Sequence, residues 1–292
     1  MLRSVLSLCL LTVVVIAQEE DAVSYEDYQL LRAYPSTPRQ LHVLRELVHK
    51  RKYDGLVQLW SQHLLVGKRP SNGNQTELSA DLLSAPQVLE DLVEQLDVSS
   101  ISYDVLIHNL EEAIQSENPP TDPESEELES RGGHRLTWRR YHRYKDIDSY
   151  MEYLATTYPD ICRTEVIGKS SQGRDLKLLK VSTGGDNIKP AIWIDGGLHA
   201  REWISPATVT YIMLQLVEFR DQHPELIDAV DWYIMPVANP DGYEYSHSTD
   251  RLWRKTRSGL KGSKSLGQEN MLWSRSQQKL GFSLGRRSNS KF

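Results

Sequence analysis

A histidine and a glutamate lie three positions apart in the stretch GGLHAREWISPAT, residues 196–208, as His199 and Glu202. Within one helical turn this spacing brings the two side chains together, so an imidazole nitrogen and a carboxylate could bind one zinc ion. Such a pair is common by chance, and a buried histidine beside a surface glutamate is the alternative interpretation. The placement favours a metal site, because two glycines and the start of a helix coincide with the pair.

Two later stretches hold residues suited to the same chemistry. In VANPDGYEYSHS a strand ends at residues 239–242, Asn-Pro-Asp-Gly, which predicts a strong turn. In DRLWRKTR four Arg or Lys residues crowd around Trp253. The alternatives are a simple turn and a solvated basic loop. Beside a zinc site, however, a guanidinium is suited to stabilise the oxyanion that forms when water attacks a carbonyl.

The elements around these residues predict a sheet that places them at one edge. Helical and strand patterns alternate from Leu136 onward, and the strands are apolar without alternation. We expect a mixed, mostly parallel sheet with helices on both faces and the working residues at the carboxyl ends of its strands. Ser205 is expected to cap the following helix, with Pro206 in its first turn. The expected helices span 144–160 and 205–220, and the expected strands lie within 162–185, 191–195 and 230–240.

Residues 19–118 form a separate pattern of two amphipathic helices and short apolar strands. The helices are expected at 36–51 and 84–98, with strands before, between and after them. This order predicts an α/β unit in which helices pack on one side of an antiparallel sheet.

The segments outside these two units have the composition of a leader, a linker and a tail. Residues 1–17 carry a basic residue and a short apolar run, which predicts a signal peptide and a secreted protein without a membrane span. Residues 119–135 are proline-rich and acidic, typical of an exposed linker, in which Arg131 and Arg135 are candidates for trypsin-like cleavage. Residues 258–292 are basic and rich in Ser and Gly, and we expect a disordered tail.

Charge and cysteine content limit the function further. The net charge of −6 gives no reason to expect a nucleic-acid partner. Loss of the leader would remove Cys9 and leave Cys162 alone, for which a buried thiol is favoured over an intermolecular disulfide. Asn74 heads an Asn-Gln-Thr triplet and is a weak candidate for glycosylation.

The stretches GLHAREW, NPDGYEYSHS and RLWRKTR together resemble zinc carboxypeptidases of the digestive A/B type, which are secreted as proenzymes. The resemblance covers residues 19–257, because residues 19–118 are similar to that family's ferredoxin-like activation propeptide and the acidic linker to its activation segment. It implies a catalytic unit over residues 136–257 and activation by a trypsin-like protease. The implied substrates are peptide or protein carboxyl termini, with no membrane partner.

The resemblance also implies roles for single residues. His199 and Glu202 would be ligands of one catalytic zinc ion, and Arg254 would polarise the scissile carbonyl. Arg201 would line the substrate cleft, and Arg251 is a weaker candidate for the same role.

The sequence departs from the family pattern after Arg257. There the family carries a third zinc ligand (a histidine), an Asn-Arg pair, a tyrosine and a general-base glutamate, whereas this chain has no histidine or tyrosine and one glutamate, Glu269. His247 is the nearest unused histidine and a poor substitute ligand. We therefore expect a catalytic domain truncated at this point, with an uncovered sheet edge, weakened zinc binding and doubtful competence. The alternative function is a non-catalytic secreted protein whose propeptide-like unit binds and inhibits intact carboxypeptidases.

Overall fold

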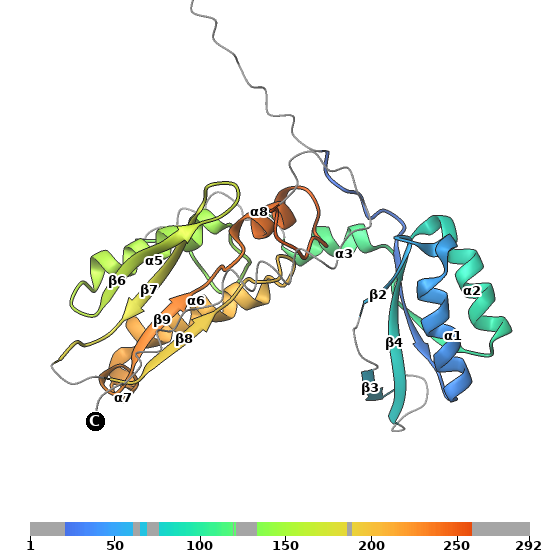
Figure 1. Cartoon of the computed structure of the whole chain (residues 1–292), viewed down its shortest axis with the longest axis horizontal. Helices are drawn as coiled ribbons and strands as arrows, with labels where there is room; N and C mark the ends of the chain where they lie inside the picture. Colours follow the sequence, from blue (N-terminus) through green and yellow to red (C-terminus); the bar gives the residue numbers. More distant parts are fainter. Residues whose placement is uncertain are drawn as a thin grey trace, which may run out of the picture.

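The computed structural model describes residues 21–60, 65–68, 76–118, 120, 133–185 and 189–258. They form two units, each built on one β-sheet, which lie side by side with the short helix α3 (Leu110–Glu117) between them (Figure 1). The predicted leader, Asn74, Arg131 and residues 259–292 of the predicted tail lie outside the described residues.

The amino-terminal unit is an antiparallel sheet, as predicted. Its strand order is β2-β4-β1-β5, and β3 pairs with the far end of β4. The central strand β4 was not among the predicted elements, because it begins in a polar stretch that reads as loop. The strands are β1 (Gln29–Tyr34), β2 (Val57–Leu59), β3 (Leu65–Lys68), β4 (Thr76–Ser84) and β5 (Ser102–Ile107).

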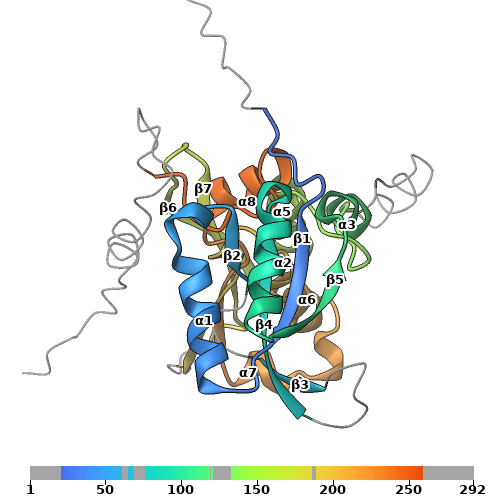
Figure 2. The ribbon, with the colours of Figure 1, turned by 90° about the vertical axis from the view of Figure 1, so that its right-hand side faces the viewer.

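Two helices cover one face of this sheet (Figure 2). In α1 (Pro38–His49), Thr37 and Gln40 form a capping box and Pro38 occupies the first position, so the start of this helix is encoded locally. In α2 (Leu89–Val98), Leu92 and Leu96 are fully buried against Leu31 of β1 and Leu82 of β4. Single 3₁₀ turns, at Arg51–Tyr53 and Pro86–Val88, connect the helices to neighbouring strands.

The second unit is a mixed sheet, as predicted, in the order β6-β7-β9-β8. Only β8 and β9 pair in parallel, whereas β6–β7 and β7–β9 are antiparallel, so the expected excess of parallel pairing is not seen among the described strands. A short turn at residues 170–174 joins β6 to β7 and forces an antiparallel pair. The strands are β6 (Cys162–Lys169), β7 (Asp175–Val181), β8 (Ala191–Asp195) and β9 (Asp231–Met235).

The two long helices of this unit, α5 (Tyr144–Thr157) and α6 (Ile204–Val217), share one face of the sheet. Both contribute to the core that contains Leu179 of β7 and Ile234 of β9. On the opposite face, Leu178 and Met235 are covered by the partly exposed side chains of Trp193 and Tyr233. Helices on both faces were expected, but the described residues place them on one. The short helix α7 (Glu225–Asp228) and the 3₁₀ turn Arg220–Gln222 connect α6 to β9.

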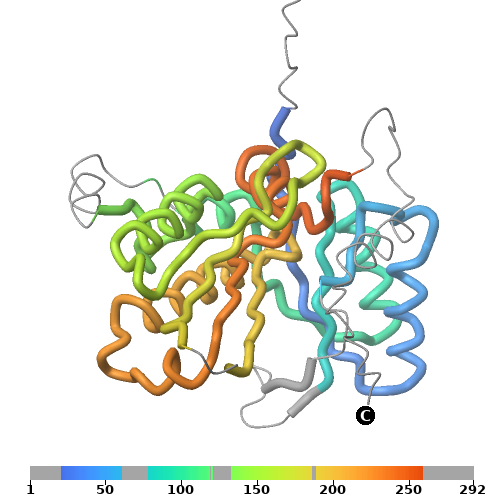
Figure 3. The backbone as a smooth tube through the Cα atoms, turned by 60° about the vertical axis from the view of Figure 1, so that its left-hand side comes forward, coloured from blue at the N-terminus to red at the C-terminus, as the bar shows by residue number. Residues whose placement is uncertain are grey.

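The two units meet through the start of the described chain and the end of helix α8 (Pro240–Ser248) (Figure 3). The Val23 N–H donates to the Thr249 carbonyl at 2.7 Å, and the Tyr25 hydroxyl donates to Asp250 at 2.6 Å. Leu252 packs into a small apolar cluster of the first unit. No described helix is both long and apolar enough to cross a bilayer.

Candidate metal and substrate site

The loop that carries His199 and Glu202 follows β8 and is held against the end of β9. The Ala238 N–H donates to the Gly196 carbonyl at 2.8 Å, and the Asn239 N–H donates to Gly197 at 3.1 Å. A Cβ atom at residue 196 would lie 2.9 Å from the Pro236 carbonyl oxygen, so only glycine permits this approach. The loop therefore lies at the carboxyl ends of two parallel strands, where the sequence placed it.

Ser205 does not cap α6, contrary to expectation. The helix begins at Ile204, Trp203 occupies the cap position, and that position makes no side-chain cap hydrogen bond. The Ser205 hydroxyl instead accepts a hydrogen bond from the Gly197 N–H at 3.1 Å. A serine just before a proline is typical of a helix cap. Here the serine oxygen instead bonds to the backbone of the loop that precedes the helix.

His199 and Glu202 come together as predicted. The imidazole Nδ1 lies 2.9 Å from a Glu202 carboxylate oxygen, and a backbone turn bond from Glu202 N–H to the His199 carbonyl fixes their spacing. An imidazole nitrogen and a carboxylate oxygen are both atom types that bind zinc, and here they face each other at hydrogen-bond distance. Among the described residues, no group of three or more His, Cys, Asp or Glu side chains could hold a metal ion. The pair therefore fits two zinc ligands, and the described chain does not complete a catalytic site.

Arg254 reaches the same point from the other side. Its Nη2 lies 3.3 Å from His199 Nδ1, although the two residues are 55 positions apart. The backbone is linked as well, because the Ala200 N–H donates to the Arg254 carbonyl at 3.1 Å. A guanidinium therefore lies directly beside the candidate zinc pair.

Arg251 is held by three partners. Its guanidinium makes a bidentate pair with Glu117 of α3, both bonds being 2.7 Å, and donates to the Arg201 carbonyl at 2.8 Å. It also stacks on the indole of Trp203, 3.7 Å from the ring centroid. Its side chain is 13% exposed, so a substrate could reach it only after Glu117 has moved.

Arg201 is a half-buried cation, and none of the ion pairs among the described residues gives it a carboxylate at salt-bridge distance. Burial lowers its pKa, and the neighbouring Arg254 lowers it further, while Glu202 acts in the opposite direction. Its guanidinium lies 5.9 Å from the ring of Trp60 in the amino-terminal unit. Two adjacent guanidinium groups with little compensating charge create a site that attracts an anion.

His247 is not near the pair. Its imidazole stacks in parallel on Trp203, with ring centroids 3.8 Å apart, and contacts Tyr243 edge-on. Burial, with smaller contributions from Arg143 and Arg251, lowers its pKa to about 3, so the ring is neutral at physiological pH. It is a packing residue beneath Trp203, and the structure gives no support to its use as a third ligand.

Comparison with known proteins connects both units to one family. Residues 147–284 match the sequence profile of zinc carboxypeptidases, and residues 31–117 match that of the carboxypeptidase activation peptide. The chain belongs to the zinc carboxypeptidases. The roles implied by this resemblance for His199, Glu202, Arg201, Arg251 and Arg254 stay predictions, which the geometry makes possible.

Individual relatives support the same assignment. The chain is 49% identical over 123 residues to carboxypeptidase B of Astacus astacus, which is 42% of this chain and 40% of the relative. It is 32% identical to zinc carboxypeptidase A 1 of Anopheles gambiae over 86% of this chain and 53% of the relative. The crystal structure of thrombin-activatable fibrinolysis inhibitor superimposes with a TM-score of 0.65 at 29% identity, covering 83% of this chain and 57% of that chain. The chain thus spans about half the length of these relatives.

Sequence reasoning missed the contribution of the activation-peptide unit to the candidate site. Glu117 and Trp60 contact Arg251 and Arg201, and Tyr25 contacts Asp250 beside them. These contacts join residues more than 130 positions apart, and no local spacing predicts them. The sequence holds one weak signal for these contacts: α3 ends in a glutamate, and an arginine-rich loop follows much later in the chain.

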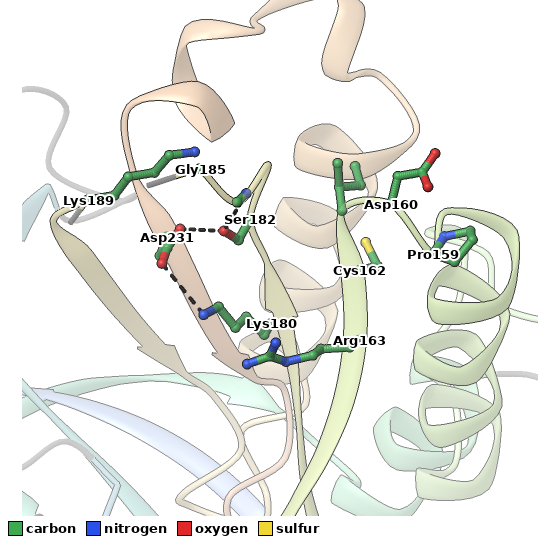
Figure 4. A pocket seen from close by; sticks show the side chains of 11 residues that line it. Pro159, Asp160, Cys162, Arg163, Lys180, Ser182, Gly185, Lys189 and Asp231 are labelled. Carbon is green, nitrogen blue, oxygen red and sulfur yellow. Dashed lines mark hydrogen bonds and ion pairs between the residues drawn. The ribbon is translucent and has the colours of Figure 1, made fainter. Parts of the chain in front are cut away.

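A cavity of about 330 Å³ lies elsewhere, at the amino-terminal ends of β8 and β9 (Figure 4). Ser182 donates to Asp231 at 2.5 Å and Lys180 lies 3.6 Å from the same carboxylate, so its polar groups are largely paired with one another. Cys162 lines it, and burial raises the pKa of this thiol to about 12, as expected for an inert cysteine. Because His199 follows the opposite end of β8, this cavity is separate from the candidate site.

Proposed function

We propose that this protein is a secreted zinc carboxypeptidase proenzyme that acts on the carboxyl-terminal residue of peptides and proteins. The observation that supports this most directly is the meeting of His199 and Glu202, 2.9 Å apart, with the guanidinium of Arg254. Zinc bound to such a pair would act as a Lewis acid on the scissile carbonyl. Secretion is proposed from the leader-like residues 1–17.

The arginines would recognise and orient the substrate. Arg254, adjacent to His199, is placed to donate to the carbonyl oxygen of the bond to be cut, where negative charge develops. Arg201 lies beside it in a cation-rich setting that favours a carboxylate ligand. A peptide carboxyl terminus presents both groups close together: the carboxylate of the last residue and the carbonyl of the residue before it, which belongs to the bond to be cut. This match favours a carboxypeptidase over an enzyme that cuts within chains.

Hydrolysis requires more than the described residues supply. A catalytic zinc normally has three protein ligands and keeps one position for water. The described residues bring two ligands together, and residues 259–292 contain no histidine. We therefore propose that this chain binds zinc weakly by itself and that turnover depends on a third donor from outside the described residues.

The activation-peptide unit is proposed to keep the site closed. Glu117 neutralises Arg251, Trp60 lies over Arg201, and Tyr25 bonds to Asp250, so the unit contacts the cationic side of the site at three points. Arg135 is exposed in an irregular segment after this unit, as a protease target should be. Cleavage after Arg131 or Arg135 by a trypsin-like protease would cut the covalent link between the two units, so that they could then dissociate.

A second candidate function has its own observation. The activation-peptide unit has a separate buried core, and it contacts Arg251 and Arg201 of the second unit. Such a unit could bind and inhibit intact carboxypeptidases without any catalysis by this chain.

The two functions can be separated in one set of assays. Purified chain, with and without trypsin treatment, is incubated with zinc and a blocked dipeptide that carries a free carboxyl terminus, with His199→Ala as the control. Release of the terminal residue by the treated wild type alone would support the proenzyme. No release, combined with inhibition of an intact carboxypeptidase by residues 21–118, would overturn it in favour of the inhibitor.

A further inference from the structure

Asn239 lies between the two loops of the candidate site and bonds to both. It follows β9, is 4% exposed, and precedes α8 as the cap residue. Its side-chain Oδ1 accepts from the Gly242 N–H at 3.0 Å. Its Nδ2 donates to the Leu198 carbonyl at 3.2 Å and to the Lys255 carbonyl at 3.0 Å. Both N–H donors of the side-chain amide are therefore used, and its oxygen accepts one hydrogen bond.

The two carbonyls belong to the neighbours of the site residues. Leu198 directly precedes His199, and Lys255 directly follows Arg254. The amide of Asn239 thus ties the backbone beside the candidate zinc ligand to the backbone beside the candidate carbonyl donor. The direct bond between these loops, from the Ala200 N–H to the Arg254 carbonyl, lies in the same place.

The residues around this amide are closely packed, which fixes the position of the neighbouring backbone. A Cβ atom on Gly242 would lie 2.4 Å from Asn239 Nδ2 and 2.4 Å from the Lys255 carbonyl oxygen, so only glycine lets the chain at residue 255 approach the cap. The indole N–H of Trp253 donates to the same Lys255 carbonyl at 2.7 Å. The position of residues 253–255 is therefore set by contacts with the residues after β9.

We propose that Asn239 is a positioning residue, which sets the distance between His199 and Arg254 through the carbonyls of Leu198 and Lys255. The consequence for zinc and substrate rests on the proposed function, but the positioning itself does not. Asparagine is the residue type that meets all three demands, because it caps a helix with its oxygen and offers two N–H donors. Aspartate has the same shape and caps equally well, but its carboxylate would face two carbonyl oxygens without a donor.

The chain provides a matched control for this substitution. Asn109 also caps a helix, because its Oδ1 accepts from the Glu111 N–H at 3.0 Å at the start of α3. Its Nδ2 reaches only the side chain of Glu112, at 3.5 Å. Asn109→Asp therefore keeps a cap and loses little, whereas Asn239→Asp keeps a cap and loses both links between the loops.

The test is amide hydrogen exchange, read residue by residue on the full chain, for the wild type, Asn239→Asp and Asn109→Asp. In Asn239→Asp we expect exchange of the Ala200 N–H to become about tenfold faster, because the loops separate. The Gly242 N–H, still capped, and the Glu218 N–H, which donates to Leu214 at the end of α6, should keep their rates. Asn109→Asp should change none of the three.

Two results would overturn the proposal. One is an unchanged Ala200 rate in Asn239→Asp. The other is equal acceleration at Ala200 and Glu218, which would mean that Asn239 supports the whole unit and not the spacing of the loops. Zinc titration of the same samples provides the functional readout, with about tenfold weaker binding expected for Asn239→Asp. Failure of the wild type to bind zinc would count against the proposed function, while the exchange rates would still decide the role of Asn239.

Discussion

The two units of this protein bury their apolar surface to different extents. In the amino-terminal unit, α1 and α2 cover one face of the sheet, and a second cluster with Tyr25, Trp60 and Leu252 covers part of the other. In the second unit, α5 and α6 share one face, and the opposite face is closed only by partly exposed side chains such as Trp193. The sheet of the unit that resembles an activation peptide is thus covered more fully on its second face than the sheet that carries the candidate site. The two units therefore need not be equally stable.

Core substitutions should separate the two units with the largest effect. Leu92→Ala in α2 and Leu154→Ala in α5 remove matched, fully buried leucines from the two cores. Each should cost about 2–5 kcal/mol of unfolding free energy in its own unit, because a cavity is left behind. Denaturant unfolding followed by hydrogen exchange should show that each substitution shifts the transition of one unit. If both variants shift a single common transition equally, the two cores unfold as one and the comparison fails.

Acid should destabilise the second unit more than the first. His247 has a folded pKa of about 3 against an ordinary value of 6.5. Between these pH values the unfolded chain binds a proton that the folded chain excludes, so stability falls as pH drops from about 6.5 to about 3 and then levels off. The loss should reach a few kcal/mol. The thermal midpoint of His247→Phe, which keeps a ring on Trp203, should depend less on pH over this range, and an unchanged dependence would exclude His247 as the cause.

The contact between the units should depend on one carboxylate of α3. Glu117→Gln keeps the shape but removes the charge opposite Arg251, which should weaken the contact by about 1 kcal/mol, since Glu117 is 34% exposed and solvent screens the pair. Trypsin cleavage after Arg251, followed by mass spectrometry, should become roughly fivefold faster. Glu112→Gln on the same helix is the control, because Glu112 contacts Asn109 of its own helix start and not Arg251. Equal rates for both variants would show that the pair does not hold the units together.

The exposed edge of the second sheet should affect association more than stability. Among the described strands β8 pairs only with β9, and Ile192 is 38% exposed along it. Ile192→Lys should change the unfolding free energy by less than about 0.5 kcal/mol but reduce self-association at high concentration, because a charge blocks edge pairing. Leu106→Lys, at the edge strand β5 of the first sheet and 39% exposed, serves as the comparison in sedimentation experiments. If both substitutions reduce self-association equally, the edges of the two sheets do not differ in this respect.

Local signals in the sequence predicted the elements but not their arrangement. The sequence patterns of residues 36–51 and 191–195 were sufficient to place α1 and β8. The Asn-Pro-Asp-Gly stretch was predicted as a turn, whereas Asn239 caps α8 and Pro240 is its first residue, because Asn and Pro suit a turn and a helix start equally well. Strand order, the insertion of β9 between β7 and β8 and the one-sided placement of α5 and α6 depend on distant contacts.

The same distinction applies to the candidate site. His199 and Glu202 could be paired from their spacing, and Arg254 from the family resemblance, since each depends on a short motif. The contacts of Glu117 with Arg251 and of Asn239 with both loops join residues 16 to 134 positions apart, and only the folded backbone brings them together. The proximity of His199 and Glu202 was therefore easier to predict than the contacts that hold them in place.

Zinc binding to the full chain tests the account most directly. Dialysed wild type is titrated with zinc against a competing chelator, in parallel with His199→Ala, Glu202→Ala and the distant control His223→Ala. We expect about one weakly bound zinc per chain, lost in the first two variants and kept in the third, because two ligands define the site and a third is missing. Binding that is unaffected by His199→Ala, or no saturable binding by the wild type at any zinc concentration, would contradict the assignment of this pair.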